Sequence, residues 1–288
     1  MKVFEQQRIP YDSFGFESAI TSLERKILME NLWTLPHWPW WQWLVLVAGG
    51  LGCGFVNTLA GGGSLLTLPL LLFLGLPPQI ANATNRLALV VSTSTAAYGF
   101  RRNGITDTKT VWWLAGPALF GGFLGALLAS HLPAEYFRKL FGTLLVLAAL
   151  PGLFQASLFQ QKPESEAPYP PKRSLIITFF FVGLYSGLIQ VGVGIWSLLL
   201  LITMGGYGVS HSNAIKVQLL LMTTILASLV FLWNDEIVLV LSATLALGNP
   251  TGAWLATRLL QEDSNTSWIR WLLLGCAIAA FLRTFRVL

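Results

Sequence analysis

The chain has 288 residues, of which 54% are hydrophobic and 11% are charged, and its formal net charge is +5. Soluble domains carry roughly 25% charged residues, so this composition excludes an ordinary soluble fold. The lysines and arginines are scattered over loops and termini, which gives no indication of nucleic-acid binding. Apolar runs of about bilayer-spanning length recur from Trp43 to the C-terminal end, and they predict an all-α integral membrane protein embedded in a lipid bilayer.

Residues 1–42 precede the first long apolar run and contain no apolar core of the kind that marks a signal peptide. Within them, apolar residues from Phe16 to Ile27 recur at helical spacing opposite charged residues, which predicts an amphipathic helix on the membrane surface. The tryptophan-rich stretch at 33–43 is typical of an interfacial anchor, although it also fits an aromatic ligand cage. The charged leader favours a cytoplasmic N-terminus.

The two halves of the chain match at one constant offset of 131 residues, which predicts a duplicated unit. The predicted repeats are residues 43–158 and 174–288, joined by a polar, proline-rich linker at 159–173. The superposed pairs are Gly52 with Gly183, Gly61 with Gly192, Gly63 with Gly194, Gly75 with Gly206, and Asn82 with Asn213.

Each half contains five apolar elements. They span 43–59, 64–76, 82–100, 111–130 and 136–157, and then 174–190, 195–206, 212–233, 237–260 and 268–285. The second element of each half is shorter than the ~20 residues needed to span, so it either recruits its flanks or folds back as a re-entrant hairpin. Both alternatives leave an odd number of crossings per half. The sequence therefore predicts two inverted-topology repeats with broken or re-entrant helices at the centre.

Glycines interrupt both short elements at the point where a membrane helix would otherwise continue. Glycine exposes backbone, which is costly in lipid unless protein or a water-filled cavity satisfies it. A helix that restarts after such a break directs N–H groups and partial positive charge at the gap, which suits an anion. The breaks therefore predict binding loops, with close helix packing as the alternative. The residues around them are Asn57, Thr58, Gly61, Gly62, Gly63, Ser64, Gln190, Gly192, Gly194 and Ser197.

The third apolar element of each half carries a cation just inside its start, Arg86 in the first half and Lys216 in the second. Cations inside an apolar span are rare and usually face a cavity or a partner. No Asp or Glu occurs within the apolar elements, so the sequence predicts an anionic substrate as their counter-ion. Alternatively, each cation snorkels to the membrane interface along its own stem, most easily Arg86. The offset places Asn85 on Lys216.

The fourth elements carry small residues at four-residue spacing, which lets membrane helices approach closely. We predict a packing role for this pattern, with a homodimer contact as the alternative. The residues are Gly121 and Gly125 in the first half, and Gly248, Gly252 and Ala256 in the second.

The glycine break followed by GLPPQIANATNRLALVVSTSTAAYGFRRNGITD, with the later GLIQVGVGIWSLLLLITMGGYGVSHSNAIK, resembles the TauE/SafE sulfite-exporter family of bacterial membrane proteins. The similarity covers most of residues 43–288, although the second half lacks a glycine triplet. It implies a multi-pass protein of the bacterial plasma (inner) membrane that exports a small sulfur-containing anion, such as sulfite or an organosulfonate. The family's signature regions fall on Asn57–Ser64 with Ala81–Asn85, and on Gln190–Gly194 with Asn213–Lys216. Asn82 and Asn213 thereby join the candidate substrate-binding residues.

The leading hypothesis is a secondary carrier that works by alternating access, in which Asn57, the Gly61–Gly63 backbone, Ser64, Gln190 and Lys216 hold an oxyanion. A passive anion channel, or a carrier for a different small anion, would use the same donors. An enzyme is not expected, because GGGS does not form a nucleophile elbow and no buried carboxylate is available as a base. We expect no cofactor or metal, since the three histidines are far apart in the sequence.

Overall fold

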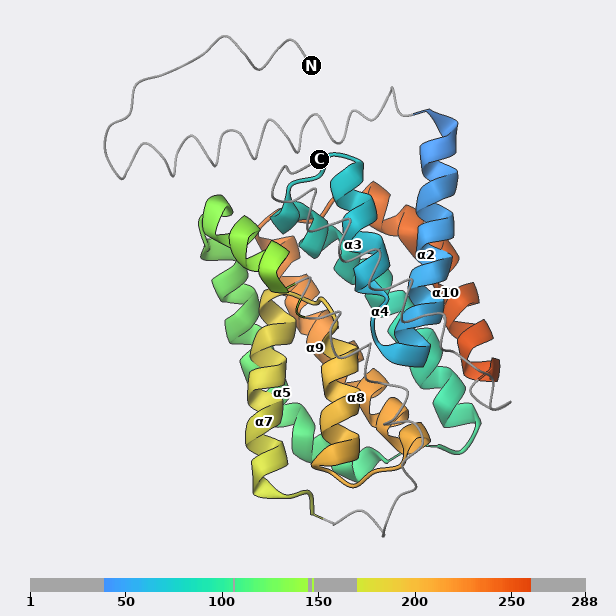
Figure 1. Ribbon diagram of the computed structural model, residues 1–288, viewed down its shortest axis with the longest axis vertical. Helices are drawn as coiled ribbons and strands as arrows, with labels where there is room; N and C mark the ends of the chain where they lie inside the picture. The colour runs from blue at the N-terminus through green and yellow to red at the C-terminus, as the bar shows by residue number, and fades with distance from the viewer. Residues whose placement is uncertain (1–38, 106, 145–146, 148–169, 260–288) are drawn as a thin grey trace. The chain divides into compact units, whose positions relative to one another are not determined.

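The computed structural model describes residues 39–105, 107–144, 147 and 170–259 (Figure 1). Within these ranges the protein is helical and contains no strand, as the sequence predicts. Four predicted features fall largely or wholly outside the described residues: the surface helix in the first 42 residues, the linker at 159–173 and the fifth apolar element of each half, at 136–157 and 268–285.

The described helices follow the predicted apolar elements to within a few residues. A further helical stretch covers 134–144. Three helices, α2, α5 and α9, are long and apolar enough to cross a membrane, whereas α3 and α8 are short, as predicted. The bounds are α2 (Trp40–Ala60), α3 (Ser64–Phe73), α4 (Pro78–Arg102), α5 (Thr108–His131), α7 (Arg173–Leu188), α8 (Val193–Thr203), α9 (Val209–Trp233) and α10 (Leu239–Leu259).

Local sequence signals explain where several helices begin and end. Helix α4 begins at Pro78, whose missing N–H costs nothing in the first turn. Helix α5 follows Asp107, whose carboxylate accepts a hydrogen bond of 3.0 Å from the N–H of Thr110. The chain leaves α3 and α8 through Gly75 and Gly206, which have positive φ values of 95° and 73° and thus adopt a conformation that favours glycine.

Each broken pair of helices forms a hairpin. In the first hairpin, Gly52 of α2 faces Leu66 of α3, and Gly63 at the start of α3 packs against Cys53, so α3 runs back along α2. In the second, the Tyr185 hydroxyl of α7 donates a hydrogen bond of 2.6 Å to the carbonyl of Val191. Figure 1 shows the two hairpins running in opposite directions, with α2 descending and α7 ascending. The breaks therefore reverse the chain.

Glycines allow two helix pairs, α2 with α10 and α5 with α7, to pack with their backbones in contact. A Cβ atom on Gly252 of α10 would overlap the carbonyl of Leu51, and one on Gly121 of α5 would overlap the carbonyl of Phe180. Contacts this close require a glycine at the crossing. The small-residue pattern of the fourth elements therefore lies inside the molecule, where α10 contacts α2 and α5 contacts α7.

The helices of the two predicted halves occur in the same order, but their spacing along the chain is not constant. Helices α4 and α9 begin 131 residues apart, as the constant offset predicts, but α3 and α8 begin 129 residues apart. The second half regains the two residues because α8 is one residue longer than α3 and the turn after it is also one residue longer. The gapless alignment therefore fits the starts of the later helices, and it is displaced by two residues at the starts of α3 and α8.

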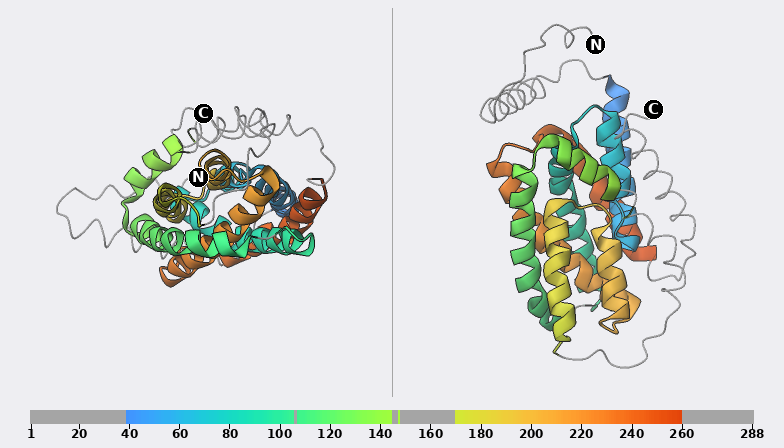
Figure 2. Two further views of the ribbon diagram at one scale, coloured as in Figure 1. Left: turned by 90° about the horizontal axis from the view of Figure 1, so that it is seen from below. Right: turned by 60° about the vertical axis from the view of Figure 1, so that its left-hand side comes forward.

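Helices α4 and α9 lie between the two hairpins and carry most of the candidate site (Figures 1 and 2). They pack against each other through small and aromatic side chains, among them Ala96 and Phe100 of α4 with Ala214 of α9. Helix α4 also contacts α10, and α9 contacts α5. Both central helices are thus enclosed by helices from the opposite half.

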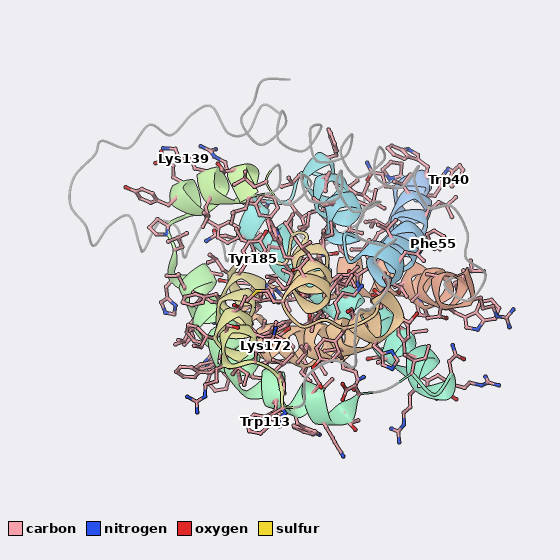
Figure 3. The ribbon with its side chains drawn as sticks, turned by 60° about the horizontal axis from the view of Figure 1, so that its bottom comes forward. Trp40, Phe55, Trp113, Lys139, Lys172 and Tyr185 are labelled. Carbon is pink, nitrogen blue, oxygen red and sulfur yellow. The ribbon has the colours of Figure 1, made fainter. Side chains whose placement is uncertain are left out.

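The outer surface of the helices is rich in large apolar side chains. Trp112 is 68% exposed, Phe120 61% and Phe181 58%. Figure 3 shows Trp40 and Trp113 at the edge of the molecule. An apolar exterior of this kind is stable in lipid and aggregation-prone in water. The protein therefore presents a surface suited to a bilayer.

Candidate functional site

The two breaks touch each other. A Cβ atom on Gly61 would overlap the backbone of Gly194, and one on Gly194 would overlap that of Gly61. Gly61 also has a positive φ of 78°, and its N–H donates to the carbonyl of Asn57 at 2.8 Å. Close packing, the alternative to a binding loop, therefore accounts for these two glycines. It also brings the two breaks to one place in the interior.

The short helices begin at this contact with uncapped N-termini. Gly63 precedes α3 and Gly192 precedes α8, and neither residue has a side chain that could cap the helix. The first N–H groups of a helix have no acceptor within the helix, and the helix dipole places partial positive charge beside them. Gly192 itself adopts a left-handed conformation, with φ of 65°. Each break thus offers backbone donors that suit an anion.

Lys216 of α9 reaches across to the end of α2. Its ammonium donates to the Asn213 side-chain oxygen at 2.6 Å and to the backbone carbonyls of Asn57 and Thr58, each at 3.5 Å. The side chain is fully buried. Because these acceptors use all three N–H groups, they fit the charged ammonium. We call Lys216, Asn213, Asn57 and Thr58 the Lys216 cluster.

The Lys216 cluster adjoins the N-terminus of α3. A Cβ atom on Gly63 would lie 2.7 Å from the Cβ of Asn57, so the residue that contacts the ammonium also packs on the residue that precedes α3. Ser64, the first residue of α3, is buried, and its hydroxyl has no hydrogen-bond partner among the described residues. A cation, an uncapped helix start and a hydroxyl therefore lie close together here.

Arg86 of α4 makes the corresponding contact with the end of α7. Its guanidinium donates to the carbonyls of Ser186 at 2.8 Å and Gly187 at 2.6 Å, and it lies 4.7 Å from the ring centre of Phe231. One turn earlier, the Asn82 amide donates to the Leu188 carbonyl at 3.2 Å, and its oxygen accepts from the N–H of Gln190 at 3.3 Å. We call Arg86, Asn82, Ser186, Gly187 and Gln190 the Arg86 cluster.

A buried carboxylate lies beside the Arg86 cluster, which corrects the expectation that the cations have no acidic neighbour in the protein. Glu236, between α9 and α10, is 1% exposed, interacts electrostatically with Arg86 and accepts a hydrogen bond of 3.2 Å from Ser130. Its backbone N–H is bonded to the carbonyl of Phe231, the residue whose ring faces Arg86. From the sequence alone Glu236 is expected in a loop, and its burial is visible only in the folded structure.

The alternative that the cations snorkel to the interface is wrong for both, since Arg86 and Lys216 are fully buried. Each instead satisfies carbonyl groups at the C-terminal end of a broken helix. Such ends carry partial negative charge and unpaired acceptors, so a cation there is stabilising. The structural equivalence also differs from the sequence alignment. The 131-residue offset aligns Asn85 with Lys216, but Arg86 makes the contacts that are equivalent to those of Lys216.

The remaining candidate side chains divide into two groups. The hydroxyls of Thr58 and Ser197 donate to carbonyls of their own helices at 2.9 Å and 2.8 Å, so they are already bonded. Asn85 and Gln190 are only partly satisfied, bonded to the hydroxyls of Thr67 and Thr224. All the predicted site residues are buried. The buried polar atoms without a partner include Asn85 Nδ2, Arg86 Nε, Gln190 Oε1 and Asn213 Nδ2.

Unpaired buried polar atoms are rare, so their concentration on the candidate residues indicates a place where a ligand could bind. The Asn213 assignment is unambiguous, because its oxygen accepts from a lysine, which leaves its amide N–H₂ as a free donor. Within the described ranges, no group of three His, Cys, Asp or Glu side chains is placed to hold a metal ion.

The sequence did not indicate Glu236, Ser130 or Ser186 as part of this region. Ser186 contributes its backbone carbonyl, which any residue could supply, so no sequence signal exists for it. Ser130 lies at the end of a long apolar helix and contacts Glu236 only through the fold. A charged residue directly before the apolar run of α10 was the one available hint of Glu236.

Comparison with known proteins identifies the family. A family model described as sulfite exporter TauE/SafE matches residues 46–284. A probable membrane transporter protein of Haemophilus influenzae is 26% identical over 77% of this chain and 86% of its own length. The probable membrane transporter protein ORF9 of Sinorhizobium sp is 28% identical, over 71% and 78%, and YfcA of Escherichia coli K12 is 25% identical, over 74% and 78%. No solved structure matches. The chain belongs to the TauE/SafE sulfite-exporter family of membrane transporters.

Proposed function

We propose that this protein is a secondary carrier that exports a small anion across the bacterial plasma membrane by alternating access. The observation that carries the proposal is the Lys216 cluster beside the uncapped start of α3. A buried ammonium, a free amide donor on Asn213 and the N–H groups at the uncapped start of α3 together suit an oxyanion.

The Lys216 cluster could exchange its present contacts for a substrate at little cost. Its two bonds to the carbonyls of Asn57 and Thr58 are 3.5 Å long, at the outer limit for hydrogen bonds. An anion oxygen placed between Lys216, Asn213 and the N–H groups of Gly63 and Ser64 would form shorter, charge-assisted bonds. The second break, with Gln190, Gly192 and Gly194, would face the same anion from the opposite half.

We propose further that the two halves are inverted-topology repeats and that transport rocks one against the other. The opposite directions of the two hairpins support this arrangement (Figure 1), as does the matching packing of α2 on α10 and of α7 on α5. Arg86 of the first half also bonds to the end of α7 in the second half, and Lys216 of the second half bonds to the end of α2 in the first half. In such carriers the substrate lies at broken helices near the midplane, where the repeats meet.

The substrate class that we propose is sulfite or a related organosulfonate, in keeping with the description of the family. The names of the relatives specify transport without a substrate. Sulfur oxyanions present several acceptor oxygens and no strongly apolar surface, and so they match a site made of donors. A carrier for another small anion would use the same site.

Flux in proteoliposomes tests the proposal. Purified protein in vesicles loaded with labelled sulfite should release it saturably, and unlabelled sulfite outside should accelerate exchange. Counterflow of this kind requires a carrier, whereas a passive channel would show single-channel conductance and no acceleration. If folded protein moves none of a panel of sulfur oxyanions, the proposed substrate class is wrong.

A further inference from the structure

Three charged side chains are buried among the residues that the structure describes: Arg86, Lys216 and Glu236. Two carry positive charge and one carries negative charge. Burying an uncompensated charge is costly, so the net charge of such a set constrains what it can bind. How the three are paired therefore matters for the substrate.

Glu236 lies near Arg86 and acts on its charge electrostatically. The loop that carries Glu236 is bonded to α4 two residues from the arginine, because the N–H of Val238 donates to the Thr84 hydroxyl at 3.1 Å. Ser242 donates to the carbonyl of the same threonine at 2.8 Å. Phe231 lies beneath the guanidinium of Arg86, and Glu236 interacts electrostatically with that guanidinium. These contacts hold Glu236 near Arg86.

Lys216 has no such partner. The contacts of its ammonium are an amide oxygen and two backbone carbonyls, all uncharged, and no described carboxylate interacts with it. The carbonyls satisfy its donors without cancelling its charge. Among the described residues, the buried charges therefore sum to +1: Glu236 offsets the charge of Arg86, and Lys216 has no acidic neighbour.

We infer that the transporter selects anions with a single negative charge, and that Glu236 determines this selectivity by neutralising Arg86. The inference rests on the proposed function, since it concerns the anion bound at the Lys216 cluster. A monoanion would bring the buried set to neutrality. A dianion would add one unpaired negative charge to the interior, which is unfavourable. Without Glu236 the interior would carry two positive charges, and a dianion would become the better match.

Two compounds of nearly the same size provide the test. Sulfoacetate carries two negative charges, whereas in sulfoacetamide an amide replaces the carboxylate and leaves one charge. Uptake of each would be measured in proteoliposomes that contain the full chain. We expect the wild type to favour sulfoacetamide by at least about tenfold, because one charge–charge interaction inside a protein is larger than the free energy of a tenfold difference. Equal transport of both compounds would overturn the inference while leaving the proposed carrier intact. Transport of neither compound would also overturn the inference, and the proposed carrier would be overturned only if sulfite exchange in the same vesicles failed as well.

Variants then locate the determinant. Glu236→Gln keeps the shape of the side chain and should shift the uptake ratio about tenfold toward sulfoacetate. The double variant Arg86→Gln/Glu236→Gln restores the net charge and should restore the preference for the monoanion, which tests the inference even if the single variant does not fold. Ser130→Ala, the control, removes a hydrogen bond to Glu236 without changing charge and should leave the ratio unchanged. If the ratio of sulfoacetamide to sulfoacetate uptake is the same in the wild type and in both charge variants, Glu236 does not determine the selectivity.

Discussion

The Arg86 and Lys216 clusters have the same construction, but they differ in the lengths of the bonds to the cation and in the charge beside it. In each, a cation on a central helix reaches the last carbonyls of a broken helix in the other half. Arg86 makes short bonds of 2.6 and 2.8 Å, faces an aromatic ring and has a carboxylate neighbour. The carbonyl bonds of Lys216 are 3.5 Å long, and its charge is uncompensated.

This difference separates a structural role from a binding role. A cation held by short bonds and a nearby carboxylate is suited to holding a helix end in place, although Arg86 Nε has no hydrogen-bond partner. An ammonium with long contacts and an unpaired amide beside it can exchange those contacts for a ligand more easily. We therefore propose that Arg86 holds α7 and that Lys216 holds the anion.

Both clusters depend on the contact between the two breaks, so the largest effect is expected there. Gly61→Ala should destabilise the protein by about 3 kcal/mol or more, because the new Cβ overlaps the Gly194 backbone and φ is positive. Gly75→Ala is the matched control, with φ of 95° and no atom within 4 Å of the new Cβ, and should cost only about 1 kcal/mol. Thermal unfolding in detergent measures both, and equal losses would disprove the close crossing.

Removing the cation with the short bonds should affect stability next. Arg86→Gln breaks two bonds to α7 and removes the positive charge that acts on the buried Glu236, which is expected to cost about 3–5 kcal/mol. Lys216→Gln removes a cation that has no described acidic neighbour, so it should lower the free energy of unfolding clearly less than Arg86→Gln does. The same unfolding measurement compares them, and a lysine variant as unstable as the arginine variant would remove the distinction between the clusters.

Lys216→Gln should instead reduce transport. Loss of a charge-assisted bond to the substrate is expected to lower sulfite flux by about 10- to 100-fold in protein that remains folded. Flux in proteoliposomes with equal amounts of folded protein measures this. Normal flux would show that the anion binds elsewhere.

The two hydroxyls that follow the breaks give the smallest and most selective comparison. Ser64→Ala should lower sulfite flux several-fold, because this hydroxyl is buried beside the Lys216 cluster and has no partner among the described residues. Ser197→Ala should change flux little, since the Ser197 hydroxyl is already bonded to the carbonyl of Val193. The reverse order would place the anion at the second break.

The sequence predicted the helices and the broken pairs well, because apolar runs and glycines are local signals. It also predicted that Arg86 and Lys216 matter, because buried cations are rare. It could not predict what they contact, since the acceptors are backbone carbonyls that carry no sequence signature. The burial of Glu236 likewise depends on a loop folding inward, and the two-residue register change arises from the lengths of one helix and one turn.

Equilibrium binding of labelled sulfite to purified protein tests the central claim most directly, because it separates recognition from transport. Wild type, Lys216→Gln and the charge-conserving double variant Arg86→Gln/Glu236→Gln would be compared per mole of folded protein. The account predicts that the lysine variant folds and loses binding, while the folded fraction of the double variant still binds. Binding of wild-type strength by Lys216→Gln, or loss of binding in the folded double variant alone, would contradict the account.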